Sequence, residues 1–293
     1  MSRYTFIRDH GTAWQLGRVC QVLAVSRPGY YAWKARPAPA AAPWHPAAEA
    51  AFSRHAQRYG TRRLRAELHA EGHAVGRCAL RTWLRASGLR ALSTRPQRPR
   101  TTQADPAHQV SENLLLHRPA PTAPDQVWVG DITYLPLAGG RWCYLAIWRD
   151  ACSRRVVGWH LDAQMPAELV TTALERALAV RQPAPGLIIH ADRGAQYTSA
   201  TCRACIEQAK ARPSYARVGN PYDNAQAEAG WSTLKTELLP ARAAFADLEE
   251  ARLEVAYYLD TYFNLDRRHS ALGYQTPHQF EQNRQQSPIL ATV

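Results

Sequence analysis

The stretch Leu187-Ile188-Ile189-His190-Ala191-Asp192 decides the fold class that we expect for this chain. Gly186–Ala191 is short and apolar, which is typical of a strand buried on both faces of a parallel sheet. Helical spacing of apolar residues precedes it in Pro166–Arg181 and follows it in Ser199–Lys210. This alternation predicts an α/β domain, with Asp192 at the carboxyl end of a strand, where sites of such folds usually form.

Working outward, three more strands are predicted upstream of this stretch. Gln126–Pro136 and Arg141–Arg149 flank a Gly139-Gly140 turn and form a hairpin, and Arg155–Leu161 follows them. A long helix is expected to start at about Asn224. Together these elements predict a mixed sheet covered by helices.

The composition is that of a folded protein with about two domains. The 293 residues are 46% hydrophobic and 20% charged, which excludes wholesale disorder. Apolar runs are too short to cross a bilayer, and the first residues do not form a secretory signal. We therefore expect a cytoplasmic, nucleoid-associated protein of bacterial type with no membrane partner.

The net charge of +12 is distributed unevenly. Residues 1–121 carry 19 Lys and Arg against 6 Asp and Glu, whereas residues 122–293 carry 17 against 18. An excess of positive charge confined to one part predicts that this part neutralises the phosphates of a nucleic acid. A merely solvated basic surface is the alternative.

Within the basic part, residues 59–88 predict two short helices joined by a turn. Apolar residues at helical spacing define each helix and a glycine ends each one: Leu64 and Leu68 before Gly72, then Leu80, Trp83 and Leu84 before Gly88. Arginines cover the remaining positions, namely Arg62, Arg63, Arg65, Arg77, Arg81 and Arg85. This pattern predicts a helix-turn-helix whose second helix enters the major groove, although any small basic helical hairpin has a similar pattern.

Two stretches rich in Pro, Ala and Arg separate the parts of the chain. Earlier still, Ser26 is placed to cap a helix that begins after it. The organisation that we predict is a helical head at 1–36, a linker at 37–48, a basic helix-turn-helix-like region at 49–105, a second linker at 106–123, an α/β domain with C-terminal helices at 124–285, and a tail at 286–293.

Three acidic residues occupy positions that structure alone explains poorly. Asp131 lies inside a predicted strand among β-branched and aromatic residues, Asp192 ends a buried strand, and Glu228 lies on the predicted long helix. Buried carboxylates that cluster repel one another unless a cation neutralises them. Oxygen ligands of this kind suit Mg²⁺, and two such ions can activate the attacking oxygen and stabilise the leaving oxygen of a phosphoryl transfer.

Cysteines do not indicate a second metal site. Cys202 and Cys205 form a Cys-x-x-Cys pair in a predicted helix, where a spacing of three places both on one face. The candidate His partners, His69 and His73, are about 130 residues away, too far for a compact zinc module. Reduced core cysteines are the favoured interpretation.

The chain resembles, over nearly its whole length, the second reading-frame (OrfB) transposases of the "IS-three" insertion-sequence family. Asp192 and Glu228 have 35 residues between them, which is the spacing of that family. The matching stretches are Val25–Tyr31, Tyr59–Leu68, Trp128–Tyr134, Ser153–Trp159, His190–Ser199, Asn220–Glu228, Thr233–Leu238 and Arg268–Tyr274.

The resemblance implies a ribonuclease-H-like catalytic core of the retroviral-integrase type, with a mixed five-stranded sheet and helices, preceded by a small all-α helix-turn-helix region. It implies that Asp131, Asp192 and Glu228 are the catalytic residues, and that each is a ligand of two Mg²⁺ or Mn²⁺ ions, without zinc. The implied reaction cleaves a 3′ strand at the element end and transfers that strand to another phosphodiester.

The same resemblance suggests DNA-binding residues. Lys235 lies two helical turns after Glu228 on the same face, where the family has a basic residue that contacts DNA ends. A solvated surface lysine is the alternative. Arg268 could belong to a DNA-facing patch or be simple surface charge, and Arg62, Arg63, Arg77, Arg81 and Arg85 are the candidates in the helix-turn-helix.

Two supporting residues flank the acidic triad. His190 lies two residues before Asp192 and points to the same side of the strand. It would either position a substrate phosphate or serve as a hydrogen-bonded structural histidine. Asn224 is expected to shape the loop before the long helix and to cap it.

The sequence departs from the family pattern at four positions. Trp148 and Arg149 replace aliphatic residues, Ala191 replaces a common Ser, and Gly76 stands where a Ser-type N-cap is frequent. We expect none of these four to touch the triad.

The expected partners are the terminal inverted repeats of the element and target DNA, bound by a homo-oligomer. The resemblance also implies an OrfA protein, supplied as a partner or by a frameshift fusion. Two other functions compete with transposition: a DNA-binding regulator that keeps the fold, which the intact triad disfavours, and a nuclease that cuts without joining, which Lys235 and the helix-turn-helix disfavour.

Overall fold

The computed structural model describes residues 3–10, 14–35, 42–92, 112–217, 223, 225–239 and 244–286, and for residues 225–229 it describes the backbone alone. The chain divides into two compact units at residues 1–49 and 50–293. Each unit is described by itself. Within the described ranges, no helix combines the length and the apolar character needed to cross a membrane.

The first unit is a small helical head. It contains α1 (Arg3–His10), α2 (Leu16–Val22) and α3 (Arg27–Lys34), which enclose Ile7, Val19, Cys20 and Tyr30. The predicted cap is confirmed, because the Ser26 hydroxyl accepts a hydrogen bond from the Gly29 amide at 3.1 Å. This bond satisfies one of the amides that a helix leaves unpaired in its first turn.

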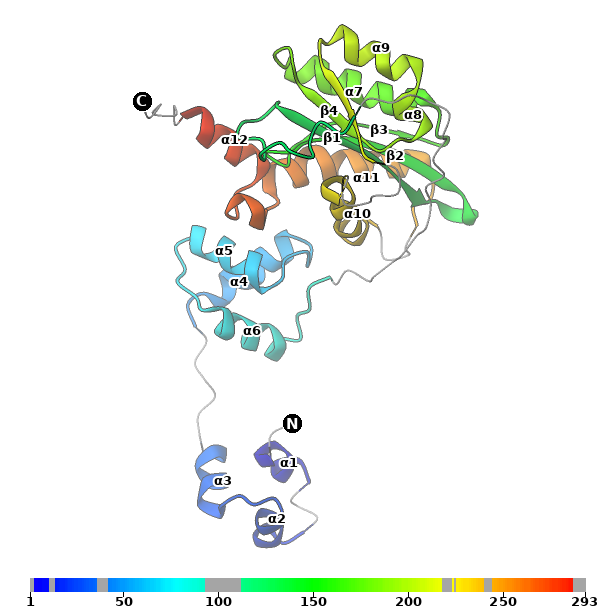
Figure 1. Cartoon of the computed structure of the whole chain (residues 1–293). Coiled ribbons are helices and arrows are strands. Elements are labelled where there is room, and N and C mark those ends of the chain that lie inside the picture. Colours follow the sequence, from blue (N-terminus) through cyan, green and yellow to red (C-terminus); the bar gives the residue numbers. More distant parts are fainter. Residues whose placement is uncertain are drawn as a thin grey trace. The chain divides into compact units, whose positions relative to one another are not determined.

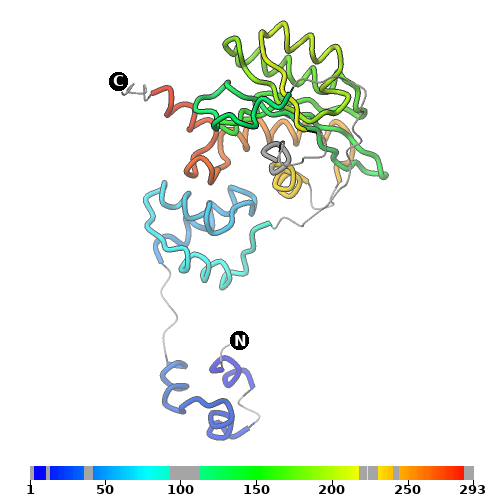
Figure 2. Tube along the Cα trace, viewed as in Figure 1, coloured from blue at the N-terminus to red at the C-terminus, as the bar shows by residue number. Residues whose placement is uncertain are grey.

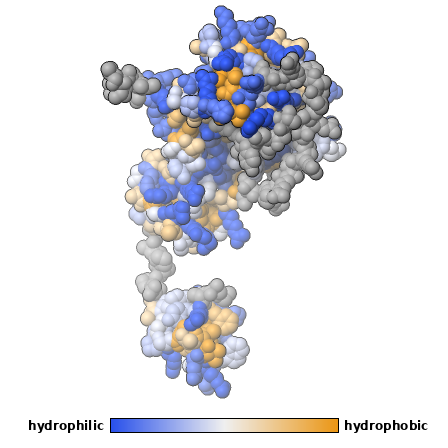
Figure 3. Space-filling model, in the orientation of Figure 1, coloured by the Kyte–Doolittle hydropathy of each residue, from blue (hydrophilic) through white to orange (hydrophobic). Residues whose placement is uncertain are grey.

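Three helices follow the head along the chain. α4 (His45–Arg54) starts inside the stretch 37–48 that we predicted as a linker, because its Ala-rich sequence favours a helix once Ala48, Ala51 and Phe52 are buried. α5 (Thr61–Ala70) and α6 (Arg77–Ala86) are the two predicted helices of the helix-turn-helix. Hydrophilic side chains project from this helical segment in the space-filling view (Figure 3).

Five strands form a mixed sheet in the order β3-β2-β1-β4-β5. β1 (Val127–Pro136), β2 (Trp142–Asp150) and β3 (Val156–Asp162) are antiparallel neighbours, and the short 3₁₀ turn η2 (Ala138–Gly140) joins the first two. β4 (Ile188–Ala191) pairs in parallel with β1. All four strands predicted from the sequence are thus confirmed to within two residues.

The fifth strand was not located from the sequence. β5 (Arg212–Tyr215) contains Pro213, which lacks a backbone N–H and normally argues against a strand. β5 tolerates this residue because it lies at the edge of the sheet and pairs only with β4. It continues the parallel half of the sheet and brings Ser214 opposite His190.

Helices cover both faces of the sheet (Figure 1, Figure 2). On one face, α7 (Ala167–Arg181), α8 (Ala195–Thr198) and α9 (Ala200–Gln208) pack over a core that includes Trp128 and Trp148. Cys202 and Cys205 are buried in this core, on the inward face of α9.

The opposite face carries α10 (Ala225–Leu238), α11 (Leu248–Ala256) and the π-helix η4 (Tyr257–Asp266). Their apolar side chains pack on the odd-numbered positions of β1 and β2, such as Leu135 and Leu145. Asn264 of η4 makes two hydrogen bonds to the backbone of the edge strand β3. Its side-chain oxygen accepts from the Val156 N–H at 3.0 Å, and its side-chain nitrogen donates to the Val156 carbonyl at 2.9 Å. These helices form the layer in which the candidate site lies.

The chain then passes through the 3₁₀ turn η5 (Ser270–Leu272) into α12 (Pro277–Gln286). Glu281 anchors this last helix: it accepts hydrogen bonds from Ser153 at 2.7 Å, Arg155 at 2.7 Å and Arg181 at 2.8 Å. Because Arg181 ends α7 and Ser153 follows β2, this buried carboxylate ties α12 to both.

Candidate active site

The strand register pairs the positions that lie two residues before Asp131 and Asp192. Val129 of β1 pairs in parallel with His190 of β4, and each aspartate comes two residues after its member of that pair. Residues two apart on a strand point to the same face, and adjacent strands are about 4.8 Å apart. Both carboxylates therefore belong to the face that α10 covers, just where β4 ends.

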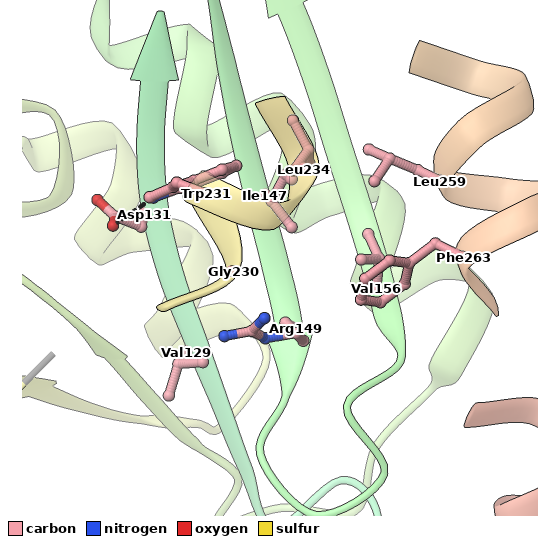
Figure 4. Close-up of a pocket in the computed structure, with 10 residues that line it drawn as sticks. All are labelled: Val129, Asp131, Ile147, Arg149, Val156, Gly230, Trp231, Leu234, Leu259 and Phe263. Carbon is pink, nitrogen blue, oxygen red and sulfur yellow. Dashed lines mark hydrogen bonds between the residues drawn. The ribbon is translucent and has the colours of Figure 1, made fainter. Parts of the chain in front are cut away.

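Asp131 is held by a side chain from α10. The indole N–H of Trp231 donates to Oδ2 of Asp131 at 2.7 Å, while Oδ1 accepts from the Ile132 amide at 2.8 Å. Figure 4 shows Trp231 lying alongside Asp131 where α10 crosses the sheet. This contact fixes both the rotamer of Asp131 and the distance between β1 and the middle of α10.

Asp192 is partly buried, as Asp131 is. Its Oδ1 accepts from the Gly194 amide at 2.9 Å. Burial raises the pKa of Asp192, although the Gly194 hydrogen bond opposes this. A carboxylate whose ionised form is disfavoured by burial is stabilised by a nearby cation, so Asp192 is an electrostatically suitable cation ligand.

The pKa of Tyr197 responds to the charges of both aspartates. Its pKa is raised well above the usual value, first by burial and then by the negative charges of Asp131 and Asp192. The Tyr197 hydroxyl is buried and makes no hydrogen bond to any side chain or backbone group that the structure describes. One side chain on α8 is thus under the influence of both carboxylates.

Helix α10 presents three of the predicted or observed site residues on one side. Glu228, Trp231 and Lys235 follow one another at intervals of three and four residues, which is the spacing of one helix face. Since Trp231 contacts Asp131, this spacing places Glu228 one turn earlier on the face directed to β1. The side chain of Glu228 lies outside the described atoms.

Lys235 packs at the far end of the same face. Its ammonium group lies over the Tyr134 ring, 4.0 Å from the centroid, and burial lowers its pKa. Tyr134 follows Asp131 on β1 by three residues. Lys235 is therefore held against the Tyr134 ring rather than extended freely into solvent, and its predicted contact with DNA stays a prediction.

His190 is engaged at both ring nitrogens. Nε2 lies 3.1 Å from the Asp223 carbonyl oxygen, which can only accept, so Nε2 carries the proton. Nδ1 then accepts from the Ser214 hydroxyl at 2.9 Å, and that hydroxyl accepts from the Leu114 amide. Burial lowers the pKa of His190, in keeping with a neutral ring.

This geometry corresponds to the structural alternative for His190. Through Asp223, two residues before α10, the ring holds the segment that leads into the helix. Arg217 reinforces it, because its guanidinium donates to both carboxylate oxygens of Asp223 at 2.9 Å. Asn224, expected to cap the helix, lies outside the described residues.

The expectation that the four family departures do not touch the triad stays a prediction. Arg149 lines the same pocket as Asp131, and the charge of Asp131 acts on its guanidinium (Figure 4). Burial lowers the pKa of Arg149 to about 10, and Asp131 counteracts that effect. This shared pocket was not expected, because Arg149 is remote from the triad in sequence, whereas β-sheet register places it opposite Val129, on the face of Asp131.

Glycines make room for both bulky departures. A Cβ at residue 230 would lie 2.7 Å from Nη1 of Arg149, so α10 approaches the guanidinium closely only because Gly230 has no side chain. On the other face, a Cβ at Gly130 would collide with the ring of Trp148. The indole of Trp148 instead packs over β1 and donates to the Val170 carbonyl at 3.1 Å.

The candidate DNA-contacting arginines fall into two groups. Arg77, Arg81 and Arg85 are exposed and recur every four residues, so they form one stripe along α6, beside the buried Leu80 and Leu84; Arg62 on α5 is exposed too. Arg63 and Arg268 instead form ion pairs within the protein, with Glu237 and Glu67 respectively. DNA binding by all of them stays a prediction.

Sequence reasoning missed Trp231 and Tyr197. Each lies in a stretch that we examined for its charged residues, three residues after Glu228 and five after Asp192. Trp231 could have been found from helical spacing, since a donor at that position faces the same strand as Glu228. Tyr197 could not, because its contact depends on how the α8 turn folds back over the sheet.

Comparison with known proteins gives consistent matches along the chain. One family model, an integrase core domain, matches residues 121–221, a second integrase core domain model matches residues 209–277, and an HTH-like domain model matches residues 46–97. The predicted ribonuclease-H-like integrase core and the preceding helix-turn-helix region are thereby confirmed.

The chain is also similar to curated proteins over most of its length. It is 37% identical over 285 residues to transposase InsF for insertion sequence IS3A of Escherichia coli (strain K12), covering 95% of this chain and 98% of that one. It is 37% identical over 233 residues to the transposase for insertion sequence element IS904 of Lactococcus lactis, covering 80% and 91%.

Among solved structures, a chain of the simian T-cell lymphotropic virus intasome in complex with PP2A regulatory subunit B56 gamma is similar to this one. The identity is 16%, the TM-score is 0.46, and the match covers 80% of this chain and 77% of that chain. The HTLV-2 integrase catalytic core domain in complex with magnesium matches at 14% identity and a TM-score of 0.38, covering 55% of this chain and 98% of that chain.

Proposed function

The chain belongs to the transposases of the IS3 insertion-sequence family, and from this premise we propose that Asp131, Asp192 and Glu228 are its catalytic triad and act on the ends of an insertion sequence. The observation that supports the proposal is the register of β1 and β4, in which Val129 pairs with His190, each two residues before one of the two aspartates. Trp231 then ties the helix that bears Glu228 to Asp131.

The donor set fits magnesium or manganese. It consists of carboxylate oxygens, which are hard ligands suited to Mg²⁺ and Mn²⁺, and burial already disfavours the ionised form of Asp192. Cys202 and Cys205 pack in the core on the opposite face of the sheet, so zinc has no soft ligands from this pair at the triad. We assign two ions to the site, held by Asp131, Asp192 and Glu228.

When bound, such ions supply charge neutralisation and activation of oxygen nucleophiles for phosphoryl transfer. The residues of this chain orient the site. Trp231 fixes Asp131, the Gly194 amide fixes Asp192, and His190 with Asp223 holds the approach to α10.

Two phosphoryl transfers follow from this arrangement. Water attacks the phosphorus of the scissile phosphodiester at the element end, and the P–O3′ bond breaks to leave a 3′-hydroxyl and a 5′-phosphate. This 3′-hydroxyl then attacks the phosphorus of a phosphodiester in another strand, forms a new P–O bond and displaces the 3′-hydroxyl of that strand. Neither step forms a covalent bond between protein and DNA. Lys235, beside Tyr134, is placed to contact the DNA backbone next to the reacting phosphate.

DNA is held chiefly by the helical segment in this proposal. The stripe of Arg77, Arg81 and Arg85 on α6 offers three guanidiniums on the helix that corresponds to a recognition helix. The terminal inverted repeats would be bound there and target DNA at the core, by a homo-oligomer. An OrfA protein, as a separate partner or a frameshift fusion, would supply further recognition of the ends.

The test uses labelled element-end DNA, the full chain and Mg²⁺. Asp192→Asn and Glu228→Gln should retain DNA binding but lose both cleavage and joining, and chelation of the metal should abolish both steps in the wild type. Glu249→Gln is the matched control, because Glu249 is an exposed acid on α11 whose side chain is 71% accessible. Unimpaired joining by Glu228→Gln would refute the assignment, and cleavage without joining in the wild type would indicate a nuclease instead.

A further inference from the structure

Three sequence stretches that match the family take little part in the proposed chemistry, yet they meet at one place in the fold. They are residues 59–68 of the helical segment, residues 233–238 at the end of α10, and residues 268–274 after η4. The side chain at their meeting point is Glu237, an acid that is only 7% exposed.

Glu237 accepts hydrogen bonds from three residues. Arg267 donates to both of its carboxylate oxygens, at 2.8 and 2.9 Å, and the Tyr258 hydroxyl donates to Oε2 at 2.9 Å. The third donor comes from the helical segment: Nη1 of Arg63 on α5 lies 3.3 Å from Oε1. A buried carboxylate needs hydrogen bonds and positive charges to offset the cost of its desolvation. Arg63 is the residue of the helical segment that supplies one of them to Glu237.

The backbone at the same position is bound by a second residue of the helical segment. Nε of Arg58 donates to the Glu237 carbonyl oxygen at 3.1 Å. The guanidinium of Arg58 also lies over the Tyr262 ring of η4, 4.4 Å from its centroid. The last turn of α10 is therefore held through both its side chain and its main chain.

A parallel set of contacts joins the helical segment to the stretch after η4. The Tyr59 hydroxyl donates to the Asp266 carbonyl at 3.1 Å and accepts from the Arg268 amide at 2.8 Å. Glu67 of α5 forms an ion pair with Arg268. Burial would raise the pKa of Glu67, but the nearby His55 ring, whose Nε2 is 3.5 Å from Oε1, and the hydrogen bond from Arg268 hold it at about 2.

We propose that Arg63 and Glu237 are positioning residues whose ion pair fixes α10, the helix bearing Glu228 and Lys235, to the DNA-binding helical segment. Glu237 lies nine residues after Glu228, about 13 Å along the helix axis. α10 is then held at one end by His190 and Asp223 and at the other by the helical segment, so DNA bound to that segment acts on the catalytic helix through Arg63. The proposal rests on the proposed function for the role of Glu228.

The structure separates this role from direct DNA contact. Arg63 has its side chain 27% accessible and turned to Glu237, whereas its neighbour Arg62 is exposed. The exposed stripe of α6 belongs to a different helix. Arg62 and Arg63 are therefore adjacent arginines in different environments. Arg62 faces solvent, where DNA could reach it, and Arg63 faces Glu237 in the protein.

The experiment compares Arg63→Gln, Arg63→Lys and Arg62→Gln in the full chain. Amide hydrogen exchange over residues 225–239 is measured without DNA, and the Mg²⁺ concentration for half-maximal cleavage is measured with saturating element-end DNA. Arg63→Gln should speed exchange in α10 about three- to tenfold and raise the Mg²⁺ requirement by a similar factor. Arg63→Lys should restore most of both values, and Arg62→Gln should leave the exchange of α10 unchanged.

Amide exchange in β1 and β2 serves as the internal reference for an intact fold. Arg63→Gln should not unfold the protein, because Glu237 keeps its hydrogen bonds from Arg267 and Tyr258. Unchanged α10 exchange in Arg63→Gln would overturn the proposal. A loss of DNA affinity with an unaltered Mg²⁺ requirement would also overturn it, because this result would mark Arg63 as a direct DNA contact. A wild-type protein that fails to cleave would contradict the proposed function, while the exchange comparison would still decide the coupling.

Discussion

Gly158 in β3 is the residue at which the sheet and α7 approach most closely. A methyl group there would collide with the Ala173 carbonyl and lie 2.7 Å from Cβ of Ala177. The obstacle is helix backbone, which cannot move aside as a flexible side chain can. Gly158→Ala should therefore lower the free energy of unfolding by about 3 kcal/mol, the upper part of the usual cost of overpacking a core.

Urea unfolding of the core measures this effect. Gly17→Ala on α2 is the matched control, because the nearest atom to its added Cβ is 4.0 Å away and alanine favours a helix. It should be neutral or slightly stabilising. Equal stability of Gly158→Ala and wild type would mean that α7 can shift away from β3.

Trp231 is a second residue whose single substitution should be informative. Trp231→Phe keeps an aromatic ring but removes the N–H that donates to Asp131 at 2.7 Å. Hydrogen bonds to charged groups contribute about 1.5–3 kcal/mol, so the cleavage rate of bound DNA should fall at least about tenfold. DNA affinity should not change. The control is Trp142→Phe, at a 47% exposed indole on β2, and equal rates for both variants would exclude an orienting role for Trp231.

Residue positions in the site were predictable to different degrees. Asp131 and Asp192 could be placed from strand patterns because side chains alternate strictly along a strand. Arg149 could not, since its proximity to Asp131 depends on the antiparallel register of β1 and β2, and Gly230 makes the space that it occupies.

Among the elements, α12 depends on one buried acid. Burial would raise the pKa of Glu281, but hydrogen bonds from Arg181 and Ser153 outweigh it and lower the pKa below its usual value of 4.5. A lowered folded-state pKa contributes stability that is fully present above about pH 4.5 and is lost as the pH falls through the folded-state pKa.

Glu281→Gln should therefore destabilise the protein by about 3 kcal/mol at pH 7, by breaking a buried ion pair. The difference from wild type should shrink as the pH falls below 4.5. Thermal or urea unfolding from about pH 7 down to about pH 3 checks this, with the exposed Glu249→Gln as control. A difference that is independent of pH would assign the effect of Glu281 to packing rather than to charge.

Elements were predicted well where periodicity was long. α7 and the hairpin strands follow from patterns of nine or more residues, whereas β5 has four residues with a proline among them. The π-helix η4 could not be predicted either, because its turn depends on tertiary contacts such as that of Asn264 with β3.

Over the whole chain, the excess of basic residues and the proposed catalytic residues lie in different parts of the sequence. Basic excess lies before residue 122, and the acidic triad lies after it. This separation could be derived from the sequence by counting. The ion pairs that Arg63 and Arg268 form with Glu237 and Glu67 could not, since each joins residues more than 170 positions apart.

The arginine stripe of α6 should determine where DNA binds on the molecule. Replacing Arg77, Arg81 and Arg85 by Gln removes three exposed charges from this stripe. Each protein–phosphate pair contributes about 0.9 to the slope of log affinity against log salt concentration, so the slope should become shallower by about 2.7. DNA affinity measured over a series of salt concentrations gives this slope.

The matched control replaces three exposed arginines of the core, Arg176, Arg203 and Arg252, by Gln and changes the net charge equally. Its slope should stay near the wild-type value, because these charges lie away from the proposed DNA contact. Equal slopes for the two triple variants would mean that net charge alone attracts DNA. An unchanged slope in the α6 variant would move the DNA contacts to another surface, and the assignment of α6 as the recognition helix would then fail.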